Sequence, residues 1–450
     1  MSLTHPVAGP GSAGSELKVR ILDRTARVAV IGVGYVGLPL AVEKAKVGFT
    51  VVGIDENPNR VHSLNAGISY IGDVKGEELS SLVTGKKLRA TSDFQVLGST
   101  DVAIICVPTP LTINRDPDVS FIANVTDKIA LYLHPGQLVV LESTTYPGTT
   151  EEVILPRLEA TGLKVGREFF LAHSPERVDP GNKRYTTKNT SKVVGGVTPA
   201  CLDMAVTFYQ QTIVDVVPVS SARVAEMVKV FENTYRAVNI ALVNEVALLC
   251  DRMGINVWEM LDAAFTKPFG IQPFYPGPGV GGHCIPIDPF YLTWKAREYD
   301  FSTRFIELAG EINLRMPYFV VEKIARALGE HGKPVRGAQI LVLGVAYKKD
   351  VADERESPAL KVMELLAKEG AAVRYYDPLV PQVKPHGFVK APLSSVPLTG
   401  DLLAASDAVV IATDHSCFDY REIVRCARLV VDTRNATKFV AEGREKIALL

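Results

Sequence analysis

The sequence predicts an α/β protein with two doubly wound parallel-sheet domains joined by a central helical domain. Short runs rich in Val, Ile and Leu alternate with amphipathic helical stretches near both ends of the chain. This alternation is typical of parallel sheets that are covered by helices. Between the two regions, Ala222–Met253 contains no Pro or Gly and carries apolar residues at helical spacing, which predicts one long helix.

The first α/β region begins with glycines after a strand and continues with a helical stretch at Leu38–Gly48. The second strand ends at Asp55. The expected strands are Arg27–Val33, Val51–Ile54, Asp101–Val107 and Gln137–Glu142. Each is followed by a polar or Gly/Pro-containing loop, which is where doubly wound folds bind their ligands.

The same order of elements returns toward the C-terminus. The segments "ILVLGVA", "VRYYD", "DAVVIAT" and "RLVVDTRN" follow the order of "VAVIGVG", "VVGID", "DVAIICV" and "QLVVLEST". A helix is expected after the first of them, at Pro358–Glu369. Four matches in one order suggest two related sheets. Chance recurrence of common strand sequences is the alternative.

These elements predict four parts of the chain. They are a flexible N-terminus or expression remnant at 1–23, a first Rossmann-like α/β domain at 24–215, a central helical and dimerisation domain at 216–325 and a second Rossmann-like α/β domain at 326–450. A long helix that spans two domains often offers a dimer surface, so at least a homodimer is expected; an ordinary core helix is the alternative.

The composition argues against several classes of partner. With 49 basic and 50 acidic residues in 450, the net charge is −1, so the chain as a whole does not attract nucleic acid or an anionic membrane. No apolar run approaches the ~18–20 residues that span a bilayer, so no membrane insertion is expected. The six cysteines form no C-x-x-C pair, which favours the reducing cytoplasm. No metal site is expected.

The motif GVGYVG at residues 32–37 stands where the first strand turns into a helix. Gly32 permits the tight turn, Gly34 lets the backbone approach a pyrophosphate, and Gly37 allows helix and strand to pack closely. Asp55 is placed to hydrogen-bond ribose hydroxyls and to repel a 2′-phosphate, which favours NAD over NADP, although Arg60 lies close enough to weaken this preference. The motif therefore predicts a Rossmann-like, NAD-binding domain.

A second motif, GGHCIPID at residues 281–288, follows a stretch too rich in Gly and Pro for a helix or strand. Cys284 can lie near a helix start, where local dipoles lower the pKa of a thiol. Asp288 lies one turn further on if this stretch is helical. An NAD fold with an accessible cysteine suggests that the thiol adds to an aldehyde, a hydride leaves, and water cleaves the thioester. A small buried cysteine in a tight loop is the alternative.

Three further groups of polar residues are candidates for chemistry. Lys229 and Asn233 are one turn apart on the long helix and either donate to a developing alkoxide or belong to a solvated stripe. Thr144, at the end of a strand, either orients water or caps the next helix. Glu176, within "HSPER", is either a base or part of a surface ion pair.

Six separated motifs together resemble the nucleotide-sugar 6-dehydrogenase family, in the order found in that family. They are "VIGVGYVGLPLA", "LESTTYPGTT", "SPERVDPGN", "AEMVKVFENTYRAVNIALVNE", "GPGVGGHCIPIDP" and "LGVAYKKDVADERESPAL". The resemblance runs from about Arg27 to Phe439, and it implies that the domain at 24–215 binds NAD and that the domain at 326–450 binds the UDP-sugar. It implies a two-step oxidation of a sugar C6 alcohol to a carboxylate, with two NAD⁺ consumed per UDP-sugar.

The resemblance implies a role for each residue that matches a family motif. The implied catalytic residues are Cys284 as nucleophile, Lys229 and Asn233 as stabilisers of the C6 oxyanion, Asp288 and Thr144 as the pair that orients water, and Glu176 as the candidate base. The implied NAD-binding residues are Gly32, Gly34, Tyr35, Val36, Gly37, Asp55, Arg60, Pro108, Thr109, Thr145 and Arg355. The implied UDP-sugar-binding residues are Arg177, Val178, Lys229, Asn233, Tyr275, Pro276, Gly277, Gly279, Gly281, Tyr347, Lys348 and Arg434. A diphosphate needs cations, which Lys348 and Arg434 would supply.

Two departures from the glucose-oxidising branch bear on the substrate. That branch usually has a second Glu four residues after the first, where this chain has Pro180, and a Lys where this chain has Ile287. "SPERVDPGN" and the cysteine segment instead resemble the branch that oxidises UDP-N-acetylhexosamines. UDP-N-acetyl-D-glucosamine is therefore the expected substrate, oxidised for a surface polysaccharide.

Several alternatives stay open. UDP-glucose, UDP-N-acetylmannosamine and UDP-N-acetylgalactosamine are the other candidate substrates. A catalytically silent nucleotide-sugar sensor is disfavoured by the presence of Cys284, Lys229 and Asp288. A two-electron dehydrogenase of the hydroxy-acid type would yield one NADH per substrate instead of two.

Overall fold

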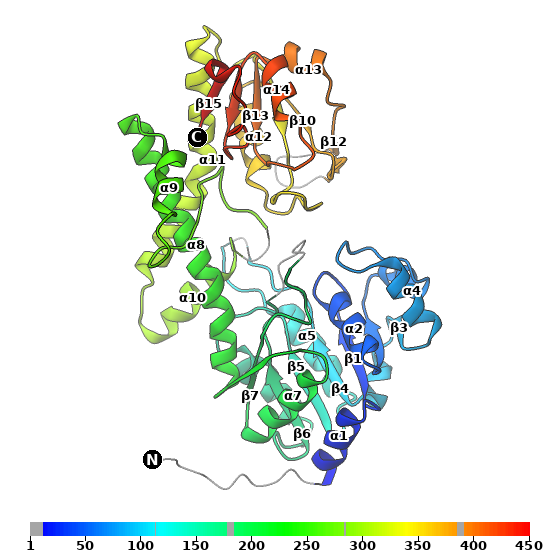
Figure 1. Ribbon diagram of the computed structural model, residues 1–450. Helices are drawn as coiled ribbons and strands as arrows, with labels where there is room; N and C mark the ends of the chain where they lie inside the picture. Colours follow the sequence, from blue (N-terminus) through cyan, green and yellow to red (C-terminus); the bar gives the residue numbers. More distant parts are fainter. Residues whose placement is uncertain (1–11, 113, 178–183, 283–284, 385–390) are drawn as a thin grey trace. The chain divides into compact units, whose positions relative to one another are not determined.

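The computed structural model describes residues 12–112, 114–177, 184–282, 285–384 and 391–450. The chain divides into two compact units (Figure 1). Unit 1 comprises Met1–Glu232 and Phe290–Phe301, and unit 2 comprises Asn233–Pro289 and Ser302–Leu450. The boundary falls within helix α8 (Ala222–Met253), so the predicted central helical segment does not form a compact unit of its own.

Unit 1 is built on an eight-stranded sheet with the order β3-β2-β1-β4-β5-β6-β7-β8. Its strands are β1 (Arg27–Ile31), β2 (Thr50–Ile54), β3 (Leu88–Thr91), β4 (Val102–Ile105), β5 (Gln137–Leu141), β6 (Phe169–His173), β7 (Lys192–Gly196) and β8 (Val216–Val219). Neighbouring strands are parallel except β6 and β7, which are antiparallel. The predicted parallel sheet is therefore confirmed, with one antiparallel pair that the sequence did not indicate.

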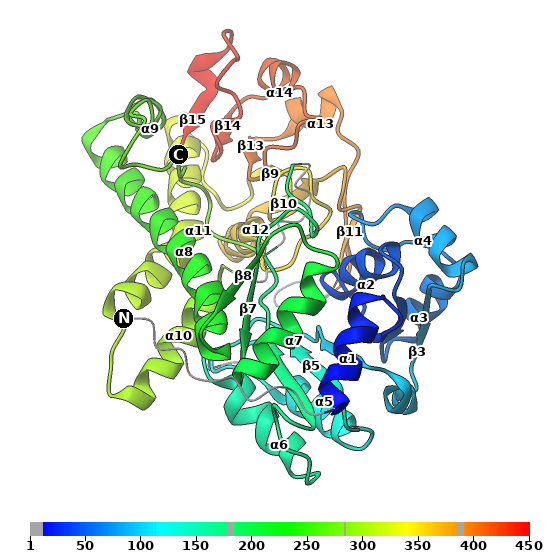
Figure 2. The ribbon, with the colours of Figure 1, turned by 60° about the horizontal axis from the view of Figure 1, so that its bottom comes forward.

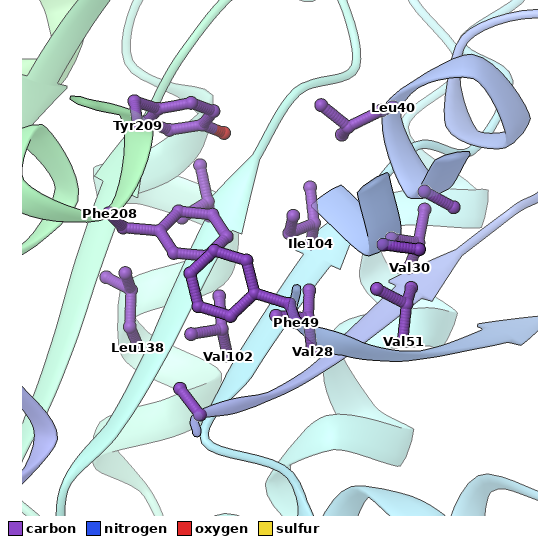
Figure 3. Packing of buried hydrophobic residues seen from close by; sticks show 14 of the residues in the cluster. Val28, Val30, Leu40, Phe49, Val51, Val102, Ile104, Leu138, Phe208 and Tyr209 are labelled. Carbon is purple, nitrogen blue, oxygen red and sulfur yellow. The ribbon is translucent and has the colours of Figure 1, made fainter. Parts of the chain in front are cut away.

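Both faces of this sheet are covered, because successive side chains of a strand point to opposite sides. Val28 and Val30 of β1 belong to a core beneath α1 (Ser12–Leu22), α2 (Gly37–Lys46) and α7 (Pro199–Gln210). In that core the rings of Phe49 and Phe208 lie 5.7 Å apart (Figure 3). Ala29 belongs to a separate core beneath α5 (Ser120–Ala130) and α6 (Leu155–Glu159). Burial on both sides explains why these strands are continuously apolar.

Within the segment 1–23, which was expected to be flexible, the described residues Ser12–Leu22 form a helix, so the expectation is wrong for them. Ser12–Leu22 forms helix α1, which lies beside α7 (Figure 2). Leu17 and Ile21, one turn apart, are fully buried in the sheet core. Arg20 forms an ion pair with Asp101 at 2.8 Å. The small apolar face of this helix is enough to attach the segment to unit 1.

Unit 2 contains a five-stranded parallel sheet with the order β10-β9-β13-β14-β15. Its strands are β9 (Gln339–Leu343), β10 (Ala372–Tyr376), β13 (Ala408–Ile411), β14 (Val430–Asp432) and β15 (Ile447–Leu449). The helices of this unit include α9 (Val257–Ala264), α11 (Arg304–Glu330) and α12 (Pro358–Lys368). The order β10-β9-β13-β14 repeats the order β2-β1-β4-β5 of unit 1, which confirms the predicted pair of related sheets.

The long helix α8 has the bounds that its Pro- and Gly-free sequence predicts. Among the described residues, no helix combines the length and the apolar character that a membrane span requires.

Candidate active site

The glycine turn of unit 1 leaves an open approach for a pyrophosphate. Gly32 has a φ of 88°, and a Cβ there would lie 2.5 Å from the carbonyl oxygen of Cys106. A Cβ at Gly37 would lie 1.9 Å from the carbonyl oxygen of Gly32. At Gly34, by contrast, the nearest atom to an added Cβ is Arg60 Nη1 at 3.9 Å. The turn thus combines a tight bend, close helix packing and an unobstructed backbone, which together fit a dinucleotide.

Asp55 follows β2 and lies beside this turn. Its Oδ2 accepts hydrogen bonds from Val33 N–H at 3.0 Å and from Arg60 Nη1 at 3.3 Å, and its Oδ1 accepts one from Asn57 N–H at 2.9 Å. The side chain retains 8% exposure. Within the turn, Tyr35 is exposed and Val36 is half-buried. A carboxylate oxygen is therefore available at the edge of the turn for ribose hydroxyls.

The loops that follow β4 and β5 are joined to each other. Thr109 Oγ1 donates to the carbonyl oxygen of Thr144 at 2.6 Å, and Tyr291 of α10 (Asp288–Ala296) donates to the carbonyl oxygen of Thr109. The hydroxyl of Thr145 is hydrogen-bonded to that of Thr149 at 2.7 Å. Pro108 is exposed in the first of these loops. Three predicted residues, Thr109, Thr144 and Thr145, therefore meet at the carboxyl edge of the sheet.

Glu176 follows β6 and is largely buried, with 13% of its side chain exposed. Its Oε1 accepts a hydrogen bond from Arg177 N–H at 2.7 Å, and its Oε2 lies 3.7 Å from Lys192 Nζ. Arg177 is bound to Glu232 at 2.6 Å and donates to the carbonyl oxygen of Ser191 at 2.7 Å. A plain surface ion pair does not describe Glu176, because its carboxylate lies against a buried lysine.

Helix α8 supplies Lys229 and Asn233, which are buried at 9% and 2% exposure. Their burial excludes the alternative of a solvated stripe. Asn233 Nδ2 donates to Asp288 Oδ2 at 2.5 Å, so two predicted residues are brought together within unit 2. Asp288 is the first residue of α10, and the condition for placing Cys284 one helical turn before it is therefore not met.

The Gly/Pro-rich loop around residue 277 forms a cradle within unit 2. The ring of Tyr275 is stacked with that of Trp258 at a centroid distance of 6.1 Å, and its hydroxyl donates to Asp262 at 3.0 Å. A Cβ at Gly277 would lie 2.6 Å from Arg434 Nη1. Arg434 Nε donates to the carbonyl oxygen of Ala412 at 3.0 Å, while burial lowers the pKa of its guanidinium. A side chain at position 277 would therefore require the guanidinium of Arg434 to move.

The end of this loop packs on the segment that follows β9. A Cβ at Gly281 would lie 2.8 Å from Tyr347 Cβ, and one at Gly282 would lie 2.9 Å from the Tyr347 ring. Gly282 N–H donates to the carbonyl oxygen of Arg355 at 3.1 Å, while the Arg355 side chain forms an ion pair with Asp353 at 2.7 Å. The structure thus brings Gly277 together with Arg434 and Gly281 together with Tyr347 within unit 2, while the substrate-binding roles of Tyr275, Pro276, Gly279 and Lys348 stay predictions.

Two predicted residues, Cys284 and Val178, lie outside the described residues. The roles assigned to them stay predictions. Among the residues that are described, no group of three or more His, Cys, Asp or Glu side chains could hold a metal ion.

Glu226 of α8 holds the segment around Gly148 and Thr150, which follows β5, and was not singled out from the sequence. Its carboxylate accepts hydrogen bonds from Gly148 N–H at 2.5 Å and from the Thr150 N–H and hydroxyl at 2.8 and 2.7 Å. Burial raises its pKa to about 7. Its place three residues before Lys229, on one helix face, is the signal that could have identified it.

Models of one protein family match most of the chain. Three models of the UDP-glucose/GDP-mannose dehydrogenase family match: the NAD-binding domain over residues 26–213, the central domain over 223–315 and the UDP-binding domain over 341–439.

Individual relatives cover most of the chain. A UDP-N-acetyl-D-mannosamine dehydrogenase of Pyrococcus horikoshii is 38% identical over 418 residues, which is 92% of this chain and 96% of that protein. A UDP-N-acetyl-D-glucosamine 6-dehydrogenase of Pseudomonas aeruginosa is 38% identical over 395 residues, covering 87% and 91% of the two chains. The solved structure of the UDP-D-ManNAc dehydrogenase from Pyrococcus horikoshii matches with a TM-score of 0.85 at 36% identity, over 94% of this chain and 98% of that one.

Proposed function

Because this chain belongs to the UDP-glucose/GDP-mannose dehydrogenase family, we propose that it oxidises the C6 hydroxyl of a UDP-N-acetylhexosamine to a carboxylate. It is an NAD-dependent nucleotide-sugar dehydrogenase. The observation that carries the proposal is the pair of nucleotide-binding features, one in each unit. Unit 1 has an open glycine turn beside Asp55, and unit 2 has the cradle in which Arg434 lies over Gly277.

The proposed chemistry uses side chains from the loops that follow β5 and β6, from helix α8, and from the segment that contains Cys284 and Asp288. NAD⁺ supplies the oxidant, since it accepts one hydride in each of two successive oxidations. Lys229 and Asn233 donate to the C6 oxygen as negative charge develops on it, and the hydroxyl proton passes to solvent as the alcohol loses a hydride and becomes an aldehyde. The thiolate of Cys284 adds to the aldehyde carbon, and oxidation of the resulting thiohemiacetal leaves a thioester on the protein.

Hydrolysis of that thioester completes the reaction. We assign Glu176 as the base that takes a proton from water, while Asp288 and Thr144 orient the water. The water oxygen attacks the thioester carbonyl carbon, the C–S bond breaks, and the thiolate returns as the uronate leaves. The hydrogen bond between Asn233 and Asp288 supports a shared role for these two residues.

The configuration of the sugar at C2 separates two candidate substrates. Relatives named for the N-acetylmannosamine and the N-acetylglucosamine substrates are both 38% identical to this chain. The longer match and the solved structure favour UDP-N-acetyl-D-mannosamine, while the sequence expectation was UDP-N-acetyl-D-glucosamine. Both share the 2-acetamido group that UDP-glucose lacks.

A substrate panel tests the proposed function. Purified protein is supplied with NAD⁺ and each UDP-hexose in turn, and both NADH and uronate are measured. We expect turnover with a UDP-N-acetylhexosamine and two NADH per uronate. Activity with UDP-glucose alone would overturn the substrate class, and one NADH per product would overturn the four-electron reaction.

We further propose a homodimer formed through α8. Seven apolar side chains of this helix, at helical spacings, have exposures between 39% and 61%; they are Val224, Met227, Phe231, Tyr235, Leu242, Leu249 and Met253. A second copy of the chain would cover such a stripe. Light scattering should give a dimer, and Leu249→Glu should shift it toward monomer; a monomeric wild type would contradict this proposal.

The cytoplasm, which supplies both NAD and UDP-sugars, is the proposed location.

A further inference from the structure

Behind Glu176, unit 1 buries a second carboxylate and a lysine that the chemistry above does not use. Glu142 directly follows β5 and is 0% exposed, and Lys192 begins β7 with 5% of its side chain exposed. Lys192 Nζ donates to Glu142 Oε2 at 2.7 Å, and the Tyr209 hydroxyl donates to Glu142 Oε1. Burying two charges costs several kcal/mol per ion unless their contacts offset it, so this pair calls for an explanation.

The order of the strands also brings the side chain of Glu176 close to Lys192. β6 pairs with β5 on one side and with β7 on the other, and Glu176 follows β6 by three residues. Its Oε2 lies 3.7 Å from Lys192 Nζ, while its Oε1 is held by Arg177 N–H at 2.7 Å. Lys192 thus contacts two carboxylates, one fully buried and one at the edge of the site.

The other titratable groups near Glu142 and Lys192 have pKa values that are shifted toward their neutral forms. Burial raises the pKa of the Cys106 thiol well above its usual value, lowers the pKa of His173 to about 3, and lowers the pKa of Lys44 to about 7. Burial also lowers the pKa of Lys192, but Glu142 and Glu176 outweigh it, so its net pKa is raised. Among these groups, Lys192 is the one that remains a cation at neutral and higher pH.

We propose that Lys192, oriented by Glu142, is a positioning residue that holds the Glu176 carboxylate in place and directs it for water activation. The Glu176 carboxylate takes one proton from water, the resulting hydroxide oxygen bonds to the thioester carbon, and the C–S bond breaks to return the thiolate. No electrons are exchanged in this step. The inference rests on the proposed function, because it assigns a support to the base of that reaction.

The test compares thioester hydrolysis in three variants of the full-length protein. In Glu142→Gln/Lys192→Met both charges are removed together, so neither is left unpaired in the core. Glu176→Gln removes the base itself. Tyr209→Phe is the matched control, because it removes a hydrogen bond to the same Glu142 while leaving Lys192 beside Glu176. Stopped-flow NADH formation and intact-protein mass measure the burst and the covalent sugar adduct.

The double variant should show a burst of NADH, a covalent adduct and a kcat lowered about 10- to 100-fold, as expected for a displaced general base. The rate of the NADH burst should stay near that of wild type, which a general loss of packing would not leave unchanged. Tyr209→Phe should stay within about threefold of wild type. If Glu176→Gln accumulates the adduct and the double variant hydrolyses normally, the inference is wrong and the proposed function stands. If Glu176→Gln accumulates none, the assignment of the base fails, and the role of Lys192 fails with it.

Discussion

The glycine turns of the two units begin with the same strand pattern and differ in what their backbone amides bind. In unit 1, Asp55 accepts a hydrogen bond from one amide of the turn, that of Val33, and keeps 8% exposure. In unit 2, Asp377 takes the place of Asp55 and accepts hydrogen bonds from both Val345 and Ala346, at 2.7 and 2.9 Å.

His415 is a second buried side chain beside the turn of unit 2. Its Nε2 lies 3.1 Å from Asp377 Oδ2, and both side chains are 0% exposed. The turn of unit 2 is therefore closed by its own carboxylate and imidazole. A strand–turn–helix unit can bind a dinucleotide only where its amides and its acidic residue remain accessible. The predictions below test this contrast, from the largest expected effect to the smallest.

Replacing the first glycine of each turn should have the largest effect. Gly32→Ala places a Cβ 2.5 Å from a backbone oxygen at a φ of 88°, and Gly344→Ala places one 2.6 Å from Thr413 at a φ of 79°. Each should destabilise its own unit by more than about 3 kcal/mol. NAD⁺ titration separates them, because only Gly32→Ala should abolish binding. Loss of NAD⁺ binding in a folded Gly344→Ala protein would contradict the contrast.

Asp377→Asn should cost about 2–4 kcal/mol, because it removes the charge that several amides and His415 surround. Burial raises the pKa of Asp377, but His415 and the backbone amides outweigh it and lower the net pKa. The folded pKa thus lies below the unfolded one, so this stabilisation is present above the unfolded pKa and is lost as pH falls through the folded pKa. Thermal unfolding of the variant and wild type from pH 7 down to pH 3 should show the difference between them shrinking.

Lys44→Met should stabilise unit 1 by about 1–3 kcal/mol at pH 7. Lys44 of α2 is fully buried, and its Nζ lies 3.7 Å from the Phe208 ring centroid. It has no hydrogen-bond partner among the described residues. In unit 2, the buried face of helix α12 carries the uncharged Met363. Burial lowers the pKa of Lys44 to about 7, below the unfolded value, so the folded state disfavours the charged form. The gain in Tm should be largest below pH 7 and should fade toward pH 10; an equal gain at every pH would show that charge is not the cause.

Gly34→Ala should change stability least, by under about 0.5 kcal/mol, because no atom lies nearer than 3.9 Å to the new Cβ. It should still weaken NAD⁺ binding about tenfold, since the methyl group enters the approach to the pyrophosphate. The matched control is Ala346→Gly at the corresponding position of unit 2. Calorimetry should find its NAD⁺ affinity unchanged.

The local pattern of the sequence was enough to predict β1, β2, β4 and β5 of unit 1, the glycine turn and the long helix, but it did not indicate β3, β6, β7 or β8. Strands such as Val51–Ile54 are continuously apolar, and α8 lacks any Pro or Gly until Gly254. The repeated order of strands also predicted the second sheet. Each of these features depends on residues that are neighbours in the chain.

Contacts between distant residues could not be predicted in the same way. Asp377 and His415 are 38 residues apart, and Lys192 and Glu142 are 50 apart, so no spacing rule joins them. The short helix α1 has little apolar sequence, and its attachment depends on the core that it meets. Glu142 directly follows the mainly apolar strand β5, and a charged residue at such a place is the sequence signal that could have indicated the buried pair.

Titration of NAD⁺ into the purified protein by calorimetry tests the contrast between the turns most directly. The account predicts one NAD⁺ site per chain, with an affinity that Asp55→Asn weakens about tenfold and Ala346→Gly leaves unchanged. Two sites per chain, or full affinity in the Asp55→Asn variant, would contradict it.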